Sequence, residues 1–191
     1  MIFETIITST NADGSPHIAP FGVRERDGML VIAPFRPSSS LDNLMRVRCA
    51  VVNMTDDVRI FAGSLTGRRD WPTSRADQID GWVLEAALTH RELELVEIKD
   101  HELRPELLFR VVHEQMHAPF RGFNRAQGAV IEASVLVSRL HMLLPEKIET
   151  ELKYLLIAME KTAGEREWQA WKWLMEVIEN FRAEQTGGNQ A

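Results

Sequence analysis

The first hundred residues are divided into short apolar runs that are rich in β-branched side chains and separated by turn signals. Such runs are typical of β-strands, and the glycine-containing turns between the first of them are short enough to join antiparallel neighbours. With the stretch that starts at Trp82, the chain offers about six strands, so we predict an antiparallel β-barrel. The runs cover residues 4–10, 17–23, 29–33, 49–53 and 93–98, and residues 58–62 form a further short element.

Beyond residue 100 the apolar residues recur at the three- and four-residue spacing of helices. Pro105 opens a first predicted helix, which has an apolar face and ends near His117. Further helices are predicted over 126–143, 145–162 and 165–182. We therefore predict an α+β fold with a β-barrel domain over 1–125, a C-terminal helical subdomain over 126–184 and a disordered tail over 185–191.

The composition narrows the class of protein. A formal net charge of −6 argues against a general nucleic-acid binder, which normally carries a basic excess. The apolar runs stay well short of the ~20 residues that cross a membrane, so we expect no membrane partner. A single cysteine, Cys49, and an N-terminus without the pattern of a secretory signal predict a location in the reducing cytoplasm.

The stretch 29–44 is a candidate phosphate cradle. It reads as a buried strand, a polar turn with Arg36 and three serines at 38–40, and the start of a helix. A helix N-terminus presents unpaired N–H groups and a partial positive charge, and an arginine can fork onto phosphate oxygens. The alternative is an ordinary serine-capped helix with a solvated arginine.

A second motif, H-E-x-x-H, occurs within the predicted helix that follows Pro105. On a helix, His113 and His117 lie one turn apart and can bind zinc, with Glu114 as a general base, as in a zinc-dependent hydrolase. The extended form of the motif fails, because Phe120 stands at its glycine position and Phe123 at its last histidine. The alternative is the polar face of an amphipathic helix.

Several segments taken together resemble the DUF447 family, within the class of FMN-binding split β-barrels. They lie at residues 4–14 with 17–23, 34–36 with 38–44, 122–126, 129–133 and 138–140. The resemblance implies a six-stranded antiparallel split β-barrel, a homodimer, and FMN held at the dimer interface. Members of the wider class include pyridoxamine-phosphate oxidases, flavin reductases and flavin carriers.

The resemblance also implies a set of cofactor-binding residues. Arg36, Ser38, Ser39, Ser40 and Asn43 are the candidates for the phosphate group. Thr8, Ser9, Thr10 and His17 are the candidates for the isoalloxazine or the ribityl chain, and Phe35 is expected to pack against the ring. Asn124 and Arg125 complete the site from the same or the partner subunit, or else form a helix cap and an ion pair.

The resemblance thus implies an FMN-binding flavoprotein and an oxidoreductase that transfers a hydride or electrons at the flavin N5. This interpretation needs no metal, and no residue stands out as an obligatory catalytic acid or base. Substrate and electron donor stay open. The alternatives are the zinc-dependent hydrolase with His113, Glu114 and His117, and a non-catalytic module that binds flavin or another anion.

Overall fold

The computed structural model describes residues 1–187 and contains two compact units. The first unit comprises residues 1–56 and 69–120 and holds the β-structure. The second unit is helical and comprises residues 57–68 together with the chain from Arg121 onward. The segment 57–68 therefore belongs to the helical unit, although it lies within the range that the sequence assigns to the barrel.

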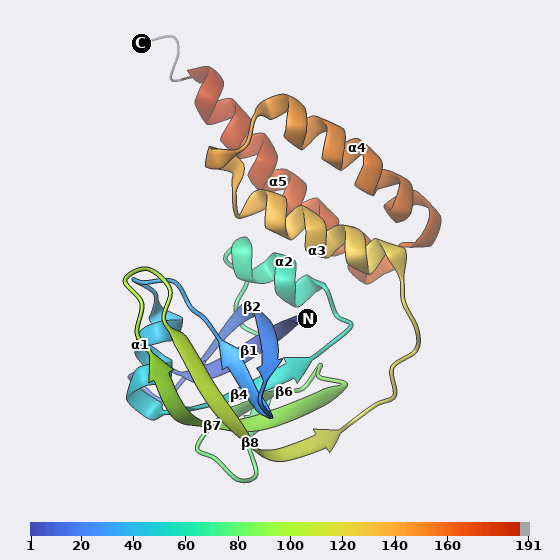
Figure 1. Cartoon of the computed structure of the whole chain (residues 1–191). Coiled ribbons are helices and arrows are strands. Elements are labelled where there is room, and N and C mark those ends of the chain that lie inside the picture. The colour runs from blue at the N-terminus through green and yellow to red at the C-terminus, as the bar shows by residue number, and fades with distance from the viewer. Residues whose placement is uncertain (188–191) are drawn as a thin grey trace. The chain divides into compact units, whose positions relative to one another are not determined.

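The first unit is a closed antiparallel barrel of six strands (Figure 1). The strands follow each other around the barrel in the order β1-β2-β3-β8-β7-β4, and β4 closes it on β1. Closure pairs every strand on both sides, and it confirms the six-stranded antiparallel barrel predicted from the sequence. The strands are β1 (Ile2–Thr10), β2 (Pro16–Arg26), β3 (Met29–Ile32), β4 (Cys49–Met54), β7 (Thr89–Lys99) and β8 (Glu106–Met116).

The barrel interior is filled by side chains that point inward from alternate strand positions. Val52 and Phe109 belong to this core and are almost inaccessible to solvent. Helix α1 (Ser39–Val47) follows β3 and adds Leu41 and Leu44 to the same core. The polar turn and the helix N-terminus that precede these leucines are therefore held at the barrel wall.

Strand β8 shows that the predicted helix from Pro105 to His117 is wrong. Leu107, Leu108 and Phe109 are all buried in succession, because β8 pairs with β3 and β7 and is covered on both faces at this point. A strand buried on both faces reads as a continuous apolar run, which periodicity does not distinguish from one face of a helix.

The outside of the barrel at β4 is covered by a separate two-stranded sheet. Asn53 on β4 accepts a hydrogen bond from the Leu84 N–H at 2.9 Å and donates one to the Ile6 carbonyl at 3.1 Å. The sheet consists of β5 (Thr73–Arg75) and β6 (Trp82–Leu84). In the sequence, residues 63–81 show no periodicity, which predicts one long loop, and β5 corrects that prediction.

The second unit consists of helices (Figure 1), which pack around one apolar core. Ala129, Met159 and Leu174 are completely or almost completely buried in this core, and they come from three different helices. The helices predicted after residue 125 are confirmed, the first with a break after residue 137. The elements are α2 (Arg59–Leu65), α3 (Arg125–Val137), a 3-10 turn (Leu140–Met142), α4 (Pro145–Thr162) and α5 (Glu165–Gly187).

The last helix continues through residues 185–187, where the sequence predicts the start of a disordered tail. The rest of that predicted tail, 188–191, lies outside the described residues. None of the helices in the described part of the chain is long and apolar enough to cross a membrane.

The barrel core predicts a large difference between two leucines close in sequence. Leu107 is 0% exposed and Leu103 is 62% exposed. Leu107→Ala removes buried methyl groups and leaves a cavity, so we expect the free energy of unfolding to fall by about 2–5 kcal/mol. The control Leu103→Ala is expected to change it by less than ~0.5 kcal/mol. Urea denaturation followed by circular dichroism measures both, and equal effects would contradict the fold.

Candidate functional site

The N-terminus of α1 combines a serine cap with backbone donors that have no acceptor within the helix itself. The Ser38 hydroxyl accepts a hydrogen bond from the Leu41 N–H at 3.3 Å, so the cap predicted as the alternative is present. The Ser38 carbonyl accepts from the Asp42 N–H at 3.1 Å. The N–H groups of Ser39 and Ser40 come earlier in the first turn, where a helix offers no internal acceptor. These two donors can therefore serve an anion.

Polar side chains hold α1 against the β1–β2 hairpin. The His17 Nε2 atom lies 2.9 Å from the Ser40 hydroxyl oxygen. Asn43 donates to Asn11 Oδ1 at 2.9 Å and to the Ser9 hydroxyl at 3.5 Å. The contacts bring together candidates that the sequence places on separate elements. We call these residues, Ser9, Thr10, His17, Ser38, Ser39, Ser40 and Asn43, the α1 cradle.

Two arginines that the sequence does not single out also belong here. Arg46 donates to the Thr10 carbonyl and to Asn43 Oδ1, the latter at 3.2 Å. Burial lowers the pKa of His17, and the positive charge of Arg69 lowers it further. The His17 imidazole is therefore neutral at pH 7, and Arg69 lies close enough to add positive potential to the α1 cradle.

Phe35 and Arg36 precede the α1 cradle and contact the loop between β7 and β8. Arg36 forms an ion pair with Asp100 at 3.0 Å, and both side chains are exposed. The Arg104 guanidinium lies 4.9 Å from the centroid of the Phe35 ring, which is 64% exposed. An exposed ion pair contributes little to stability, so Arg36 can exchange Asp100 for another anion at low cost.

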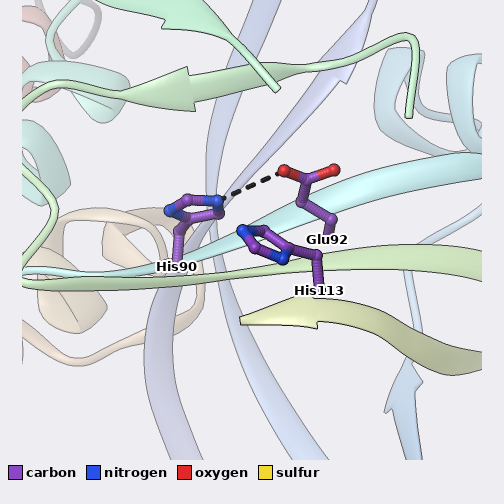
Figure 2. A group of neighbouring side chains, drawn as sticks. All are labelled: His90, Glu92 and His113. Atoms are coloured by element: carbon purple, nitrogen blue, oxygen red, sulfur yellow. Dashed lines mark hydrogen bonds and ion pairs between the residues drawn. The ribbon is translucent and has the colours of Figure 1, made fainter. Parts of the chain in front are cut away.

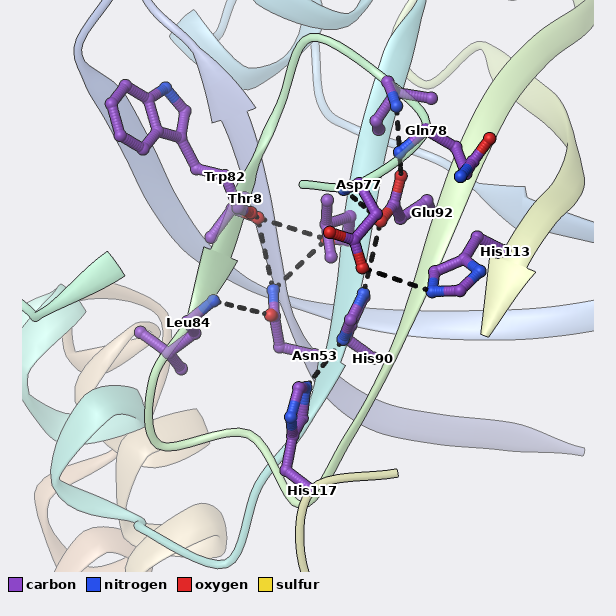
Figure 3. A network of polar contacts seen from close by, with 12 residues as sticks. Thr8, Asn53, Asp77, Gln78, Trp82, Leu84, His90, Glu92, His113 and His117 are labelled. Carbon is purple, nitrogen blue, oxygen red and sulfur yellow. Dashed lines mark hydrogen bonds and ion pairs between the residues drawn. The ribbon is translucent and has the colours of Figure 1, made fainter. Parts of the chain in front are cut away.

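The remaining candidates lie elsewhere. Thr8 points to the opposite side of β1 from Ser9, and its hydroxyl donates to the Trp82 carbonyl (Figure 3). Asn124 caps α3 by accepting from the Ala126 N–H at 2.8 Å, which is the cap alternative. Arg125 belongs to the helical unit, where it is exposed and lines a pocket of about 350 Å³.

The first four residues of the H-E-x-x-H motif, 113–116, lie on β8 and His117 follows directly after it, so the helical zinc-hydrolase geometry predicted for the motif is wrong. Neighbouring side chains of a strand point to opposite faces, and Glu114 forms an ion pair with Arg91 at 2.8 Å instead. The pairing of β8 with β7 places Glu92 opposite His113. Figure 2 shows His113 close to Glu92 and His90. One ligand atom from each of the three residues lies within 4.8 Å of the others.

Glu92 is the most strongly constrained member of this cluster. It is 0% exposed, and its two oxygens accept from the backbone N–H groups of Asp77 at 2.7 Å, Gln78 at 2.7 Å and Ile79 at 3.0 Å (Figure 3). Burial by itself raises the pKa of Glu92, but these donors and His90 outweigh it, so the net pKa is lowered. The carboxylate is therefore ionised at neutral pH.

The sequence misses His90 and Glu92 because they lie in a segment that reads only as a strand. The available signal was their spacing of two residues. His90 and Glu92 are separated by Arg91, so on a strand their side chains point to the same face. A face with two potential ligands two residues apart is visible in the sequence. Its burial is not, because the cover comes from residues 77–79.

Two family models match the chain. "Protein of unknown function (DUF447) N-terminal domain" matches residues 3–118, and "Protein of unknown function (DUF447)" matches residues 124–176. A search of the curated proteins found no match.

Solved structures share the fold. FMN-bound protein MM1853 from Methanosarcina mazei, which carries the DUF447 family model, is 20% identical, with a TM-score of 0.80 over 92% of this chain and 94% of that one. The 2-nitrobenzoate 2-nitroreductase of Pseudomonas fluorescens is 22% identical, with a TM-score of 0.51 over 60% and 64%. An NADH:FAD oxidoreductase of Streptomyces globisporus is 10% identical, with a TM-score of 0.51 over 63% and 79%. These likenesses confirm the split-barrel fold class.

The environment of Glu92 predicts a pH-dependent contribution to stability. Because its pKa is lowered in the folded state, the ionised carboxylate stabilises the fold above the pKa of the unfolded chain, and this stabilisation is lost as the pH falls through the folded-state pKa. We expect Glu92→Gln to lower the free energy of unfolding at pH 7 by about 2–3 kcal/mol. The difference from the wild type should narrow below about pH 4.

The matched control is Glu94→Gln on the same strand. Glu94 is exposed and pairs with Arg110 at 2.7 Å, so its loss is expected to cost less than ~1 kcal/mol. Urea denaturation over a series of pH values measures both variants. A constant difference between Glu92→Gln and the wild type from pH 7 to pH 3 would contradict the assignment.

Proposed function

We propose that this chain, which belongs to the DUF447 family, is an FMN-binding flavoprotein. The observation that carries the proposal is its likeness to an FMN-bound protein of the same family over 92% of the chain. The match to this protein has a TM-score of 0.80 and includes both the barrel and the helical unit. The nitroreductase and the NADH:FAD oxidoreductase match about three fifths of the chain.

The α1 cradle fits the phosphate group of FMN. It offers the N–H groups of Ser39 and Ser40, serine hydroxyls, and the positive end of a nine-residue helix. Arg36 stands two residues before the cap and can donate two hydrogen bonds to a phosphate. The donor set is that of an anion site, and the net charge of the whole chain, −6, does not determine this local potential.

We further propose that the protein is an oxidoreductase. FMN, when bound, supplies hydride or electron transfer through its isoalloxazine ring. The chain supplies the anchor for the phosphate and the orientation of the ring, and His17 supplies a neutral imidazole within hydrogen-bonding distance of Ser40. The nitroreductase and the NADH:FAD oxidoreductase named above support this class of reaction through their shared fold.

A homodimer in the cytoplasm completes the proposal. Ile2 and Phe3 at the start of β1 are large apolar side chains that the single chain leaves exposed. Such side chains are suited to a subunit interface. The single cysteine, Cys49, is half-buried, and burial raises its thiol pKa, which suits a protein that uses no disulfide.

The phosphate anchor predicts a specific loss of FMN affinity. We expect Arg36→Ala to weaken FMN binding about ten- to a hundredfold, because a charge-assisted hydrogen bond is removed. Riboflavin lacks the phosphate, so its affinity should not change in this variant. Titration monitored by flavin fluorescence measures both ligands, and sedimentation velocity on the same samples should give the mass of two chains.

Arg110→Ala is the matched control, because Arg110 is an exposed arginine of the barrel that pairs with Glu94. Its FMN affinity should equal that of the wild type. Equal FMN affinity in Arg36→Ala would remove Arg36 from the site, and a wild type that fails to bind FMN would overturn the proposal itself.

Turnover separates the oxidoreductase from a non-catalytic flavin module. We expect the FMN-loaded protein to oxidise NADH or NADPH with ferricyanide as the acceptor, faster than the same concentration of free FMN, because the pocket orients donor and flavin. Absorbance at the nicotinamide band follows the reaction. A protein that retains FMN but oxidises neither nicotinamide above the free-flavin rate would support the non-catalytic module instead.

A further inference from the structure

The register of the barrel brings three potential metal ligands to one face. Glu92 on β7 stands opposite His113 on β8, and His90 precedes Glu92 by two residues and so points the same way. The face is the outer one, because the strand partners of His90 and Glu92 on β4 are Asn53 and Val51, which alternate with the core residue Val52. The cluster is thus separate from the barrel core.

The spacing of the three side chains suits a metal ion. The His90 Nε2 and Glu92 Oε1 atoms are 3.4 Å apart, which matches the separation of about 3.4 Å between two ligands on tetrahedral zinc. One ligand atom of each of the three side chains lies within 4.8 Å of the others. Figure 2 shows the three side chains grouped together. Small side-chain rotations therefore suffice to bring all three onto one ion.

The charge states of His90 and Glu92 are those that ligation requires. Burial lowers the pKa of His90, against an opposing effect of its hydrogen bond to Glu92, so the imidazole is neutral at pH 7. Glu92 is ionised, as described above. An ionised carboxylate can only accept, so His90 Nε2 donates the hydrogen bond to Glu92 at 3.4 Å. Ligation through Nε2 therefore moves that proton to Nδ1, which lies 2.8 Å from His117 Nε2.

The surrounding groups orient the ligands. The His117 Nε2 atom lies 2.8 Å from His90 Nδ1, and the two rings stack at 5.0 Å (Figure 3). The backbone N–H groups of residues 77–79 fix the Glu92 carboxylate. Metal-binding histidines and carboxylates characteristically have such outer partners, which set ring orientation and tautomer.

A purely structural network leaves one atom unexplained. Glu92 holds the loop at 77–79 without any help from His113. Yet the His113 Nε2 atom is inaccessible to solvent and, within the described residues, has no hydrogen-bond partner. The carboxylate of Asp77 lies 3.6 Å away and adds negative charge beside it. A buried imidazole nitrogen next to two carboxylates is the expected environment of a ligand that faces a cation.

We propose that His90, Glu92 and His113 bind one divalent transition-metal ion of the first row, with Zn²⁺ as the reference ion. Two imidazoles and one carboxylate suit such ions, and three protein ligands leave a position open for water or a further ligand. The His113 side chain is 30% exposed, so it provides the path of entry. The site is independent of FMN binding.

The test uses the full chain, dialysed against EDTA and then against metal-free buffer, with and without saturating FMN. We expect isothermal titration with Zn²⁺ to give one ion per chain in both states. Co²⁺ should give visible ligand-field bands that Zn²⁺ abolishes, which reports ligation by protein side chains. Expected affinity losses are more than tenfold for His113→Ala and about tenfold for His117→Ala, which removes the outer partner of His90.

The matched control is His141→Ala, since His141 is exposed and belongs to the helical unit. Its Zn²⁺ affinity should equal that of the wild type. Circular dichroism confirms that each variant is folded, and His113 is a safe substitution because its side chain is partly exposed. Absence of stoichiometric Zn²⁺ in the wild type, or unchanged affinity in folded His113→Ala, would overturn the proposal, whatever the result of the FMN titration.

Discussion

Strand β4 is buried on both faces, and this double burial determines how the outside of the barrel is built. Val52 points into the apolar core, whereas Asn53 points outward beneath the segment that contains β6. A buried amide has to be hydrogen-bonded, because an unpaired polar group away from water is costly. Asn53 meets this requirement by binding backbone groups of Ile6 and Leu84, so the cover is held by polar contacts.

The same requirement extends to β7, which pairs with β4. His90 and Glu92 stand opposite Asn53 and Val51, and both are buried under the same cover. Glu92 takes its hydrogen bonds from three successive backbone N–H groups of the covering segment. The outward-facing residues Asn53 on β4 and Glu92 on β7 therefore hold the covering segment, whose regular elements are the short strands β5 and β6, in place.

The sequence predicts the parts of this structure that depend on local pattern. Turn residues and β-branched runs identify the barrel strands from β1 to β4, and Pro145 marks the start of α4 at the residue where it begins. The part of the α1 cradle on the helix is local as well, since Ser38 to Ser40 and Asn43 lie within six residues. Contacts between distant segments are a different matter. The approach of Asn11 to Asn43 depends on how α1 packs against the hairpin.

The H-E-x-x-H motif shows why spacing alone was insufficient. Two histidines four residues apart form the zinc site of this motif only if they lie on a helix. The helix was predicted because Leu107, Leu108 and Phe109 form a continuous apolar run, which in the structure is a strand buried on both faces. His113 on β8 and His117 just after it both contact His90, a residue that the motif does not contain, with ring centroids 5.8 Å and 5.0 Å from it. The two histidines thus lie beside one residue, but that residue, His90, is 23 positions before His113 in the chain.

The two polar sites of the barrel differ in the sign of the ligand they suit. The α1 cradle presents donors, because Ser39 and Ser40 offer N–H groups and the carbonyls of the first turn are used within the helix. The cluster at His90, Glu92 and His113 contains groups that can act as acceptors, since one ligand atom of each side chain lies within 4.8 Å of the others and Glu92 is ionised. Donors that converge select an anion, and acceptors that converge select a cation. The two sites of one domain therefore prefer ligands of opposite charge because one offers hydrogen-bond donors and the other acceptors. The net charge of the chain predicts neither preference.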